Sequence, residues 1–141
     1  MAKRLKWQEY DYTIQVGPGN SWVYRPIIEI RVSQKGTPRQ VPVLAMIDSG
    51  TDGTVLDANI AERLGIDPAH CRKVKLGGIG SVEGFLSTVH LSLPDLKIGM
   101  DIPIVFAHNL PMEGLLGQRH FFQRFKVRFE KDINKFYLSA V

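Results

Sequence analysis

The chain has 141 residues, which fits one domain, and its 44% hydrophobic and 23% charged residues exclude a disordered chain. A single cysteine, Cys71, excludes an intrachain disulfide, so the fold must depend on its hydrophobic core. The net charge of +4 makes nucleic acid a partner to consider. The basic residues are scattered, however, and scattered charge gives solubility without forming a binding site.

The first residues of the chain, Met1–Trp7, are basic, and no apolar segment follows them. We therefore expect no secretory signal. No apolar run approaches the roughly 20 residues that span a bilayer. These features predict a cytoplasmic protein without a membrane partner.

The first half of the chain alternates in the manner of β-strands. One strand is predicted over Trp22–Val32, with Ile28 and Ile30 on one face. Residues 34–38 have turn composition, and the apolar segment Val41–Ile47 predicts a second, buried strand. Residues 54–56 are strand-like as well.

One short helix is predicted after these strands, over Ala58–Leu64. Asp57 is a favourable N-cap, and Gly65 stands where a glycine would end the helix. Pro68 prevents its continuation.

The second half of the chain is again rich in strand formers. Residues 74–93 and 96–106 predict two or three hairpin strands, and a second short helix is expected after Gly117. A terminal hairpin is predicted over residues 125–138, turning at 131–134. Short strands with one or two short helices predict a mainly β, barrel-like domain.

A carboxylate directly follows the apolar strand at Asp48. A buried carboxylate is costly unless it is hydrogen-bonded or functional. Ser49 and Thr51 offer hydroxyls, and Gly50 has no Cβ to block its N–H from the carboxylate. Asp-Ser-Gly alone is also typical of a strand that ends in an Asx or Ser turn.

The wider segment Leu44–Val55 resembles the active-site loop of retropepsin-like aspartic proteases. Two later segments resemble that family in the right order: the glycine-rich flap tip at Leu76–Gly80 and the hydrophobic-hydrophobic-Gly segment at Gly114–Gly117. The resemblance implies a closed acid-protease barrel over residues 24–141, with one lobe per chain. Residues 1–23 are then an N-terminal extension of unknown role.

This resemblance implies a role for each residue of the site. Asp48 is the expected catalytic residue, and no cofactor or metal is expected. Support of the loop is expected from Ser49, Gly50 and Thr51, and substrate contacts from Asp52, Gly53, Gly78, Ile79 and Gly80.

Peptide hydrolysis of this kind needs two aspartates that share one proton. The chain has one Asp-Ser-Gly segment, so it supplies half of a site and predicts a two-fold homodimer acting on a peptide or protein. In the family the residue at Ser49 joins a hydrogen-bond network across the axis. The terminal strand at residues 136–141 is the expected interface.

Thr51 and the residues after the late glycine lead to two further predictions. A hydroxyl of Thr51 that donates to Asp48 favours the charged carboxylate, which predicts a more acidic pH optimum than in members with Ala there. Retroviral members usually have Arg after the late glycine, paired with the acidic residue that matches Asp52. Here Gln118 stands there and Arg119 follows, so either Arg119 turns toward Asp52 or the pair is absent.

Other functions are less well supported by the sequence. The four histidines lack zinc spacing, no local signature supports Cys71 as a nucleophile, and Gly77–Gly80 lacks the Lys-Ser/Thr of a Walker loop. A nucleic-acid-binding domain is disfavoured because the aromatic and basic residues of Phe125–Phe129 would face opposite sides. The main alternative is a catalytically silent barrel that binds a peptide or protein.

Overall fold

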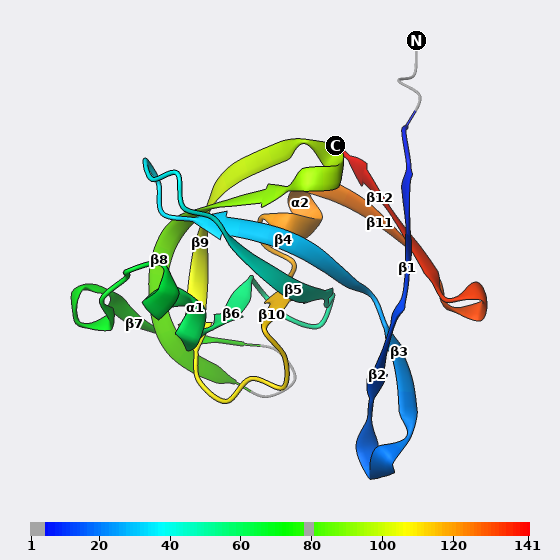
Figure 1. Cartoon of the computed structure of the whole chain (residues 1–141), viewed down its shortest axis with the longest axis horizontal. Helices are drawn as coiled ribbons and strands as arrows, with labels where there is room; N and C mark the ends of the chain where they lie inside the picture. The colour runs from blue at the N-terminus through cyan, green and yellow to red at the C-terminus, as the bar shows by residue number, and fades with distance from the viewer. Residues whose placement is uncertain (1–4, 78–80) are drawn as a thin grey trace.

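The computed structural model describes residues 5–77 and 81–141, and within them the expected mainly β closed barrel is confirmed (Figure 1). Six strands close the barrel in the order β4-β5-β10-β6-β9-β8, and β8 pairs back onto β4. A further strand, β7 (Arg72–Leu76), pairs with β8 outside the ring. The barrel strands are β4 (Ile27–Ser33), β5 (Val41–Ile47), β6 (Val55–Asp57), β8 (Val82–Leu93), β9 (Ile98–Ala107) and β10 (Gly114–Leu116).

The alternating apolar residues of β4 and β5 fill the barrel as predicted. Ile28 and Ile30 of β4 are buried, as are Val43 and Ala45 of β5. The strand predicted over Val41–Ile47 is present as β5, and it is buried on one face, since Pro42 and Leu44 are exposed. Burial of the inward set supplies the apolar area that stabilises the barrel.

The single strand predicted over residues 22–32 is also wrong. Pro26 separates β3 (Trp22–Arg25) from β4, because proline has no N–H to continue a ladder. The carbonyl of Pro26 accepts a hydrogen bond from the N–H of Ile47 at 2.9 Å. The two halves therefore enter different sheets, and the bend lies next to the end of β5.

Both predicted helices are present. The helix α1 (Ala58–Arg63) begins as expected, with Oδ1 of Asp57 accepting from the N–H of Asn59 at 2.9 Å. Its C-cap is Leu64, and Gly65 follows with a φ of 77° that suits glycine. The second is α2 (Phe121–Arg124). Short 3₁₀ segments lie in the described connections: η1 (Pro18–Asn20), η2 (Pro68–His70), η3 (Pro94–Leu96) and η4 (Lys131–Ile133).

A second sheet of three strands packs beside the barrel. The predicted terminal hairpin is confirmed as β11 (Phe125–Glu130) and β12 (Lys135–Ala140), and β1 (Gln8–Asp11) pairs with the other edge of β12. Tyr10 of β1 stacks on Phe136 at 5.1 Å, and burial, with a smaller effect of Asp95, raises the pKa of Tyr10 to about 12. Since β12 is paired on both sides within one chain, the free edges are those of β1 and β11.

The remaining strands form a hairpin of β2 (Thr13–Val16) and β3 that extends away from the barrel (Figure 1). Its two strands pair only with each other among the described strands. No helix in residues 5–77 or 81–141 has the length and apolar character needed to cross a membrane.

Candidate active site

The loop that carries Asp48 is held in place by the chain that leaves β10. The strand β10 lies between β5 and β6, parallel to β5, with Leu116 opposite Ile47. The N–H of Asp48 donates to the carbonyl of Leu116 at 2.9 Å. The residues after β10 continue along the loop, where the N–H of Gln118 donates to the carbonyl of Thr51 at 2.8 Å. The loop is therefore fixed by backbone bonds rather than left free.

The carboxylate of Asp48 has a partner for each oxygen. Its Oδ1 accepts the N–H of Gly50 at 2.9 Å, and glycine has no Cβ that would hinder this close approach. Its Oδ2 accepts from the hydroxyl of Thr51 at 3.4 Å, longer than a usual O–H···O bond. Asp48 is only half-buried, and Ser49 and Gly50 are exposed. In a single chain the carboxylate thus lies at an open surface.

A mostly apolar cavity of about 260 Å³ lies next to Asp48. It is large enough for a side chain of a bound peptide, and its apolar walls favour an apolar one. The lining residues come from the active-site loop, the β7–β8 hairpin and the segment before β10: Asp48, Gly50, Thr51, Val55, Leu76, Gly77, Val82, Leu110, Pro111 and Leu115.

The β7–β8 hairpin carries the segment that was predicted as a flap. Its predicted tip residues, Gly78, Ile79 and Gly80, lie outside the described residues. Directly before that tip, the N–H of Asp52 donates to the carbonyl of Gly77 at 3.4 Å. A Cβ on Gly77 would lie 2.8 Å from Oδ2 of Asp52, so the Asp52 side chain lies against this part of the hairpin.

The structure decides between the two alternatives for Arg119. No ion pair joins Asp52 to Arg119, both of which are among the described residues. Only the backbone connects them, through the N–H of Arg119 and the carbonyl of Asp52 at 2.8 Å. The side-chain pair of the retroviral pattern is therefore absent.

Sequence reasoning missed one supporting residue, Gln118. Its Nε2 donates to the carbonyl of Ser49 at 2.7 Å, in addition to its backbone bond to Thr51. The available signal was that Gln118 stands where the family usually has Arg. We interpreted this difference only as the possible loss of the ion pair with Asp52. Gln118 instead connects the end of β10 to the residue next to Asp48.

Replacing Gln118 with Met should lower kcat about three- to tenfold while changing the free energy of unfolding by about 1 kcal/mol or less, because one exposed hydrogen bond is lost. Steady-state cleavage and chemical denaturation measure the two effects. Gln123→Met is the matched control, since the exposed side chain of Gln123 also bonds a backbone group, the N–H of His120 at 2.9 Å, away from the loop. An equal loss of kcat in both variants would show that the Gln118 bond has no special role.

Replacing Thr51 with Ala should move the pH–rate profile upward, because the hydroxyl that favours a charged carboxylate is removed. At 3.4 Å the contact is long, so we expect the change in the profile to be small. Thr51→Ser, which keeps the hydroxyl, is the control. A profile of Thr51→Ala that coincides with that of the wild type would rule out this role.

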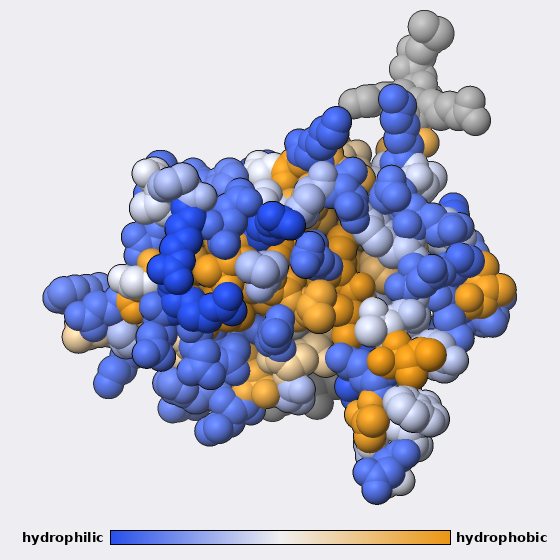
Figure 2. Space-filling view, in the orientation of Figure 1, coloured by the Kyte–Doolittle hydropathy of each residue, from blue (hydrophilic) through white to orange (hydrophobic). Residues whose placement is uncertain are grey.

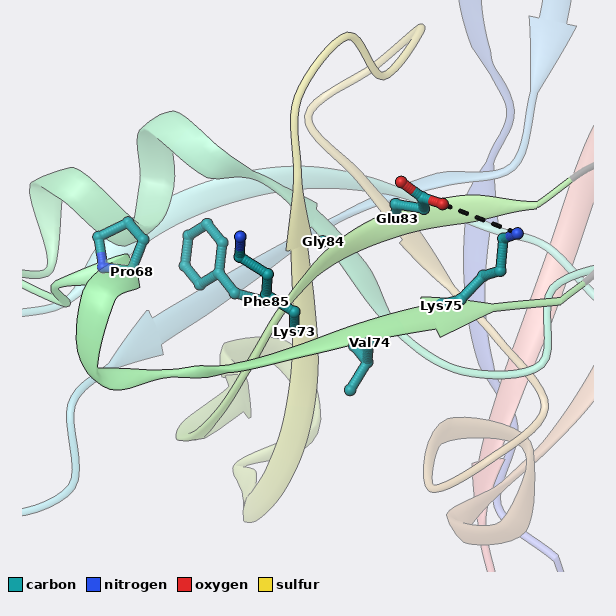
Figure 3. Close-up of a pocket in the computed structure, with 7 residues that line it drawn as sticks. All are labelled: Pro68, Lys73, Val74, Lys75, Glu83, Gly84 and Phe85. Carbon is teal, nitrogen blue, oxygen red and sulfur yellow. Dashed lines mark ion pairs between the residues drawn. The ribbon is translucent and has the colours of Figure 1, made fainter.

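A larger cavity of about 590 Å³ lies on the β7–β8 hairpin, away from Asp48 (Figure 3). Lys75 of β7 and Glu83 of β8 form an ion pair of 3.7 Å on its rim, and Phe85 lies at its other end. None of its lining residues comes from the Asp48 loop, so it is not part of this site. Residues 5–77 and 81–141 contain no group of three or more His, Cys, Asp or Glu side chains placed to hold a metal.

A closed barrel with an Asp-Ser-Gly loop clamped by a parallel β10 defines the acid-protease class of folds. A family model described as "Aspartyl protease" matches residues 29–119. A retropepsin-like aspartic protease from Rickettsia conorii has a similar structure, with a TM-score of 0.58 and 17% identity over 99% of this chain and 97% of that chain. No curated protein matches the chain. The chain belongs to the aspartyl protease family, and its fold is retropepsin-like.

Proposed function

We propose that the chain is an aspartic endopeptidase that hydrolyses peptide bonds between two Asp48 carboxylates, one from each copy of a homodimer. The observation that carries this proposal is the Asp48 carboxylate itself. It is held by the N–H of Gly50 in a clamped loop, yet it lies at an open surface beside an apolar cavity. A barrel that only bound peptides would not need a positioned carboxylate there.

The chemistry requires the two carboxylates to share one proton. Two like charges about 3 Å apart do not both ionise, so one Asp48 is charged and the other protonated. The charged one takes a proton from a water while the water oxygen attacks the scissile carbonyl carbon. The protonated one donates its proton to the carbonyl oxygen, which gives a gem-diol. Collapse of the gem-diol breaks the C–N bond, and a proton passes to the leaving nitrogen.

The neighbouring residues have supporting roles in this proposal. Gly50 and Thr51 orient the carboxylate, and Ser49, which is exposed, would contact the second copy. Asp52 and Gly53 would contact the substrate backbone together with the flap tip. The cavity beside Asp48 would receive an apolar side chain of the substrate.

Cleavage of a peptide library between pH 4 and 7 tests the proposal, with Asp48→Asn at equal concentration as the control. Sedimentation velocity on the same samples establishes the dimer. We expect cleavage by the wild type that rises more steeply than linearly with protein concentration near the dimer dissociation constant. A proven dimer that cleaves nothing would favour the alternative of a silent, peptide-binding barrel.

A further inference from the structure

The β2–β3 hairpin has an apolar face that the described chain leaves largely exposed. Ile14 lies opposite Tyr24, and Val16 opposite Trp22, so all four side chains share one face. Trp22 is 71% exposed, Val16 59% and Ile14 52%. Hydrophobic side chains appear on this projecting segment in the space-filling view (Figure 2). Because an isolated two-stranded hairpin is at best marginally stable in water, such a face indicates a partner.

The root of the hairpin lies next to the catalytic loop. Directly after β3 comes Pro26, whose carbonyl accepts the N–H of Ile47, the residue before Asp48. Lys131 also holds this root, with its Nζ 5.2 Å from the ring centre of Tyr24. From Pro26 back to Trp22 the strand spans about 13 Å at the usual rise. If Asp48 lies beside a two-fold axis, the hairpin starts beside that axis, within reach of the second copy.

The charge of the hairpin also fits a second copy. Residues 13–25 contain one charged side chain, Arg25, and its Nη1 already donates to Oε1 of Gln15 at 2.9 Å. The whole chain carries a net charge of +4, so an uncharged face limits repulsion between two copies. The same face offers no cluster of basic groups to recognise an acidic peptide or a nucleic acid.

We propose that the β2–β3 hairpin is a dimerisation arm whose apolar face packs against a second copy of this chain. This inference rests on the proposed function, since the two-fold axis is placed at Asp48 by the need for a second carboxylate. It gives the segment before the barrel a role: the arm brings together two half-sites that are incomplete alone.

The double variant Ile14→Ser/Trp22→Ser tests the arm, by sedimentation velocity over a concentration series. We expect the dimer dissociation constant to rise about tenfold or more, because buried aromatic anchors dominate interfaces. Leu44→Ser is the matched control, since Leu44 on β5 is 52% exposed, the same as Ile14, and it should change the constant less than about twofold. Trp22→Ser alone is a second variant that removes the most exposed of these side chains.

Each outcome of this experiment decides the point. The arm is supported if the variants keep their fold by circular dichroism, dimerise more weakly and regain cleavage at higher protein concentration. An unchanged dissociation constant overturns it, while cleavage by the wild type leaves the proposed function intact. The fluorescence of Trp22 on phosphatidylcholine vesicles is measured in a Trp7→Phe background. A blue shift of its emission, together with an unchanged dimer dissociation constant, would overturn the dimerisation arm in favour of binding to a lipid surface.

Discussion

The Asp48→Asn variant is expected to keep its fold and dimer and to lose peptide cleavage by about 10³-fold or more. The carboxamide has the shape of the carboxylate, and its oxygen can still accept the N–H of Gly50 that now binds Oδ1 at 2.9 Å. It cannot take a proton from water at any pH in the working range. The free energy of unfolding should change by less than about 0.5 kcal/mol, since the side chain is half-buried and its main contact is kept.

Mixed dimers of wild type and variant test whether each active site needs Asp48 from both chains. When wild type and Asp48→Asn are co-expressed in equal amounts, random pairing leaves about one quarter of the dimers with two intact carboxylates. Cleavage per wild-type chain should therefore fall to about half, and to about one tenth at a ninefold excess of the variant. Cleavage that stays constant per wild-type chain would show that each chain works alone.

The parts of the structure that the sequence predicted are those that depend on local patterns. Alternation in β4 and β5, the Asp57 cap and the Gly65 stop of α1 each involve residues close in the chain. The strand predicted through Pro26 is wrong because the alternation continues across it while the backbone does not. In this case the missing N–H of proline outweighs the periodicity.

The site was harder to predict because it depends on contacts between distant residues. β10 has three residues, too few for a periodic pattern, and it pairs with β5 about 70 residues earlier. Only the resemblance placed Gly114–Gly117 near Asp48. The bond from Gln118 to Ser49 was not visible from any local rule, since an exposed glutamine has many possible partners.

Gly117→Ala is expected to lower the free energy of unfolding by about 3 kcal/mol and to reduce cleavage more than tenfold. A Cβ at Gly117 would lie 2.6 Å from the carbonyl oxygen of Thr51 and would also clash with the carbonyl of Gly53. Both obstacles are backbone, so no side-chain rotation relieves them. The loop must move away from the chain after β10, which breaks the 2.8 Å bond between the N–H of Gln118 and the carbonyl of Thr51.

The same substitution at Gly53 is the matched control, because a Cβ there would meet only Leu76, at an ordinary 3.6 Å. Gly53→Ala should therefore change the free energy of unfolding by less than about 1 kcal/mol. Chemical denaturation of both variants and of the wild type makes the comparison. If Gly117→Ala were as stable as Gly53→Ala, the close approach of the two backbones would not be what holds the loop. A large difference between them would show that Asp48 is positioned by the chain some 70 residues beyond it, through backbone contact that only glycine permits.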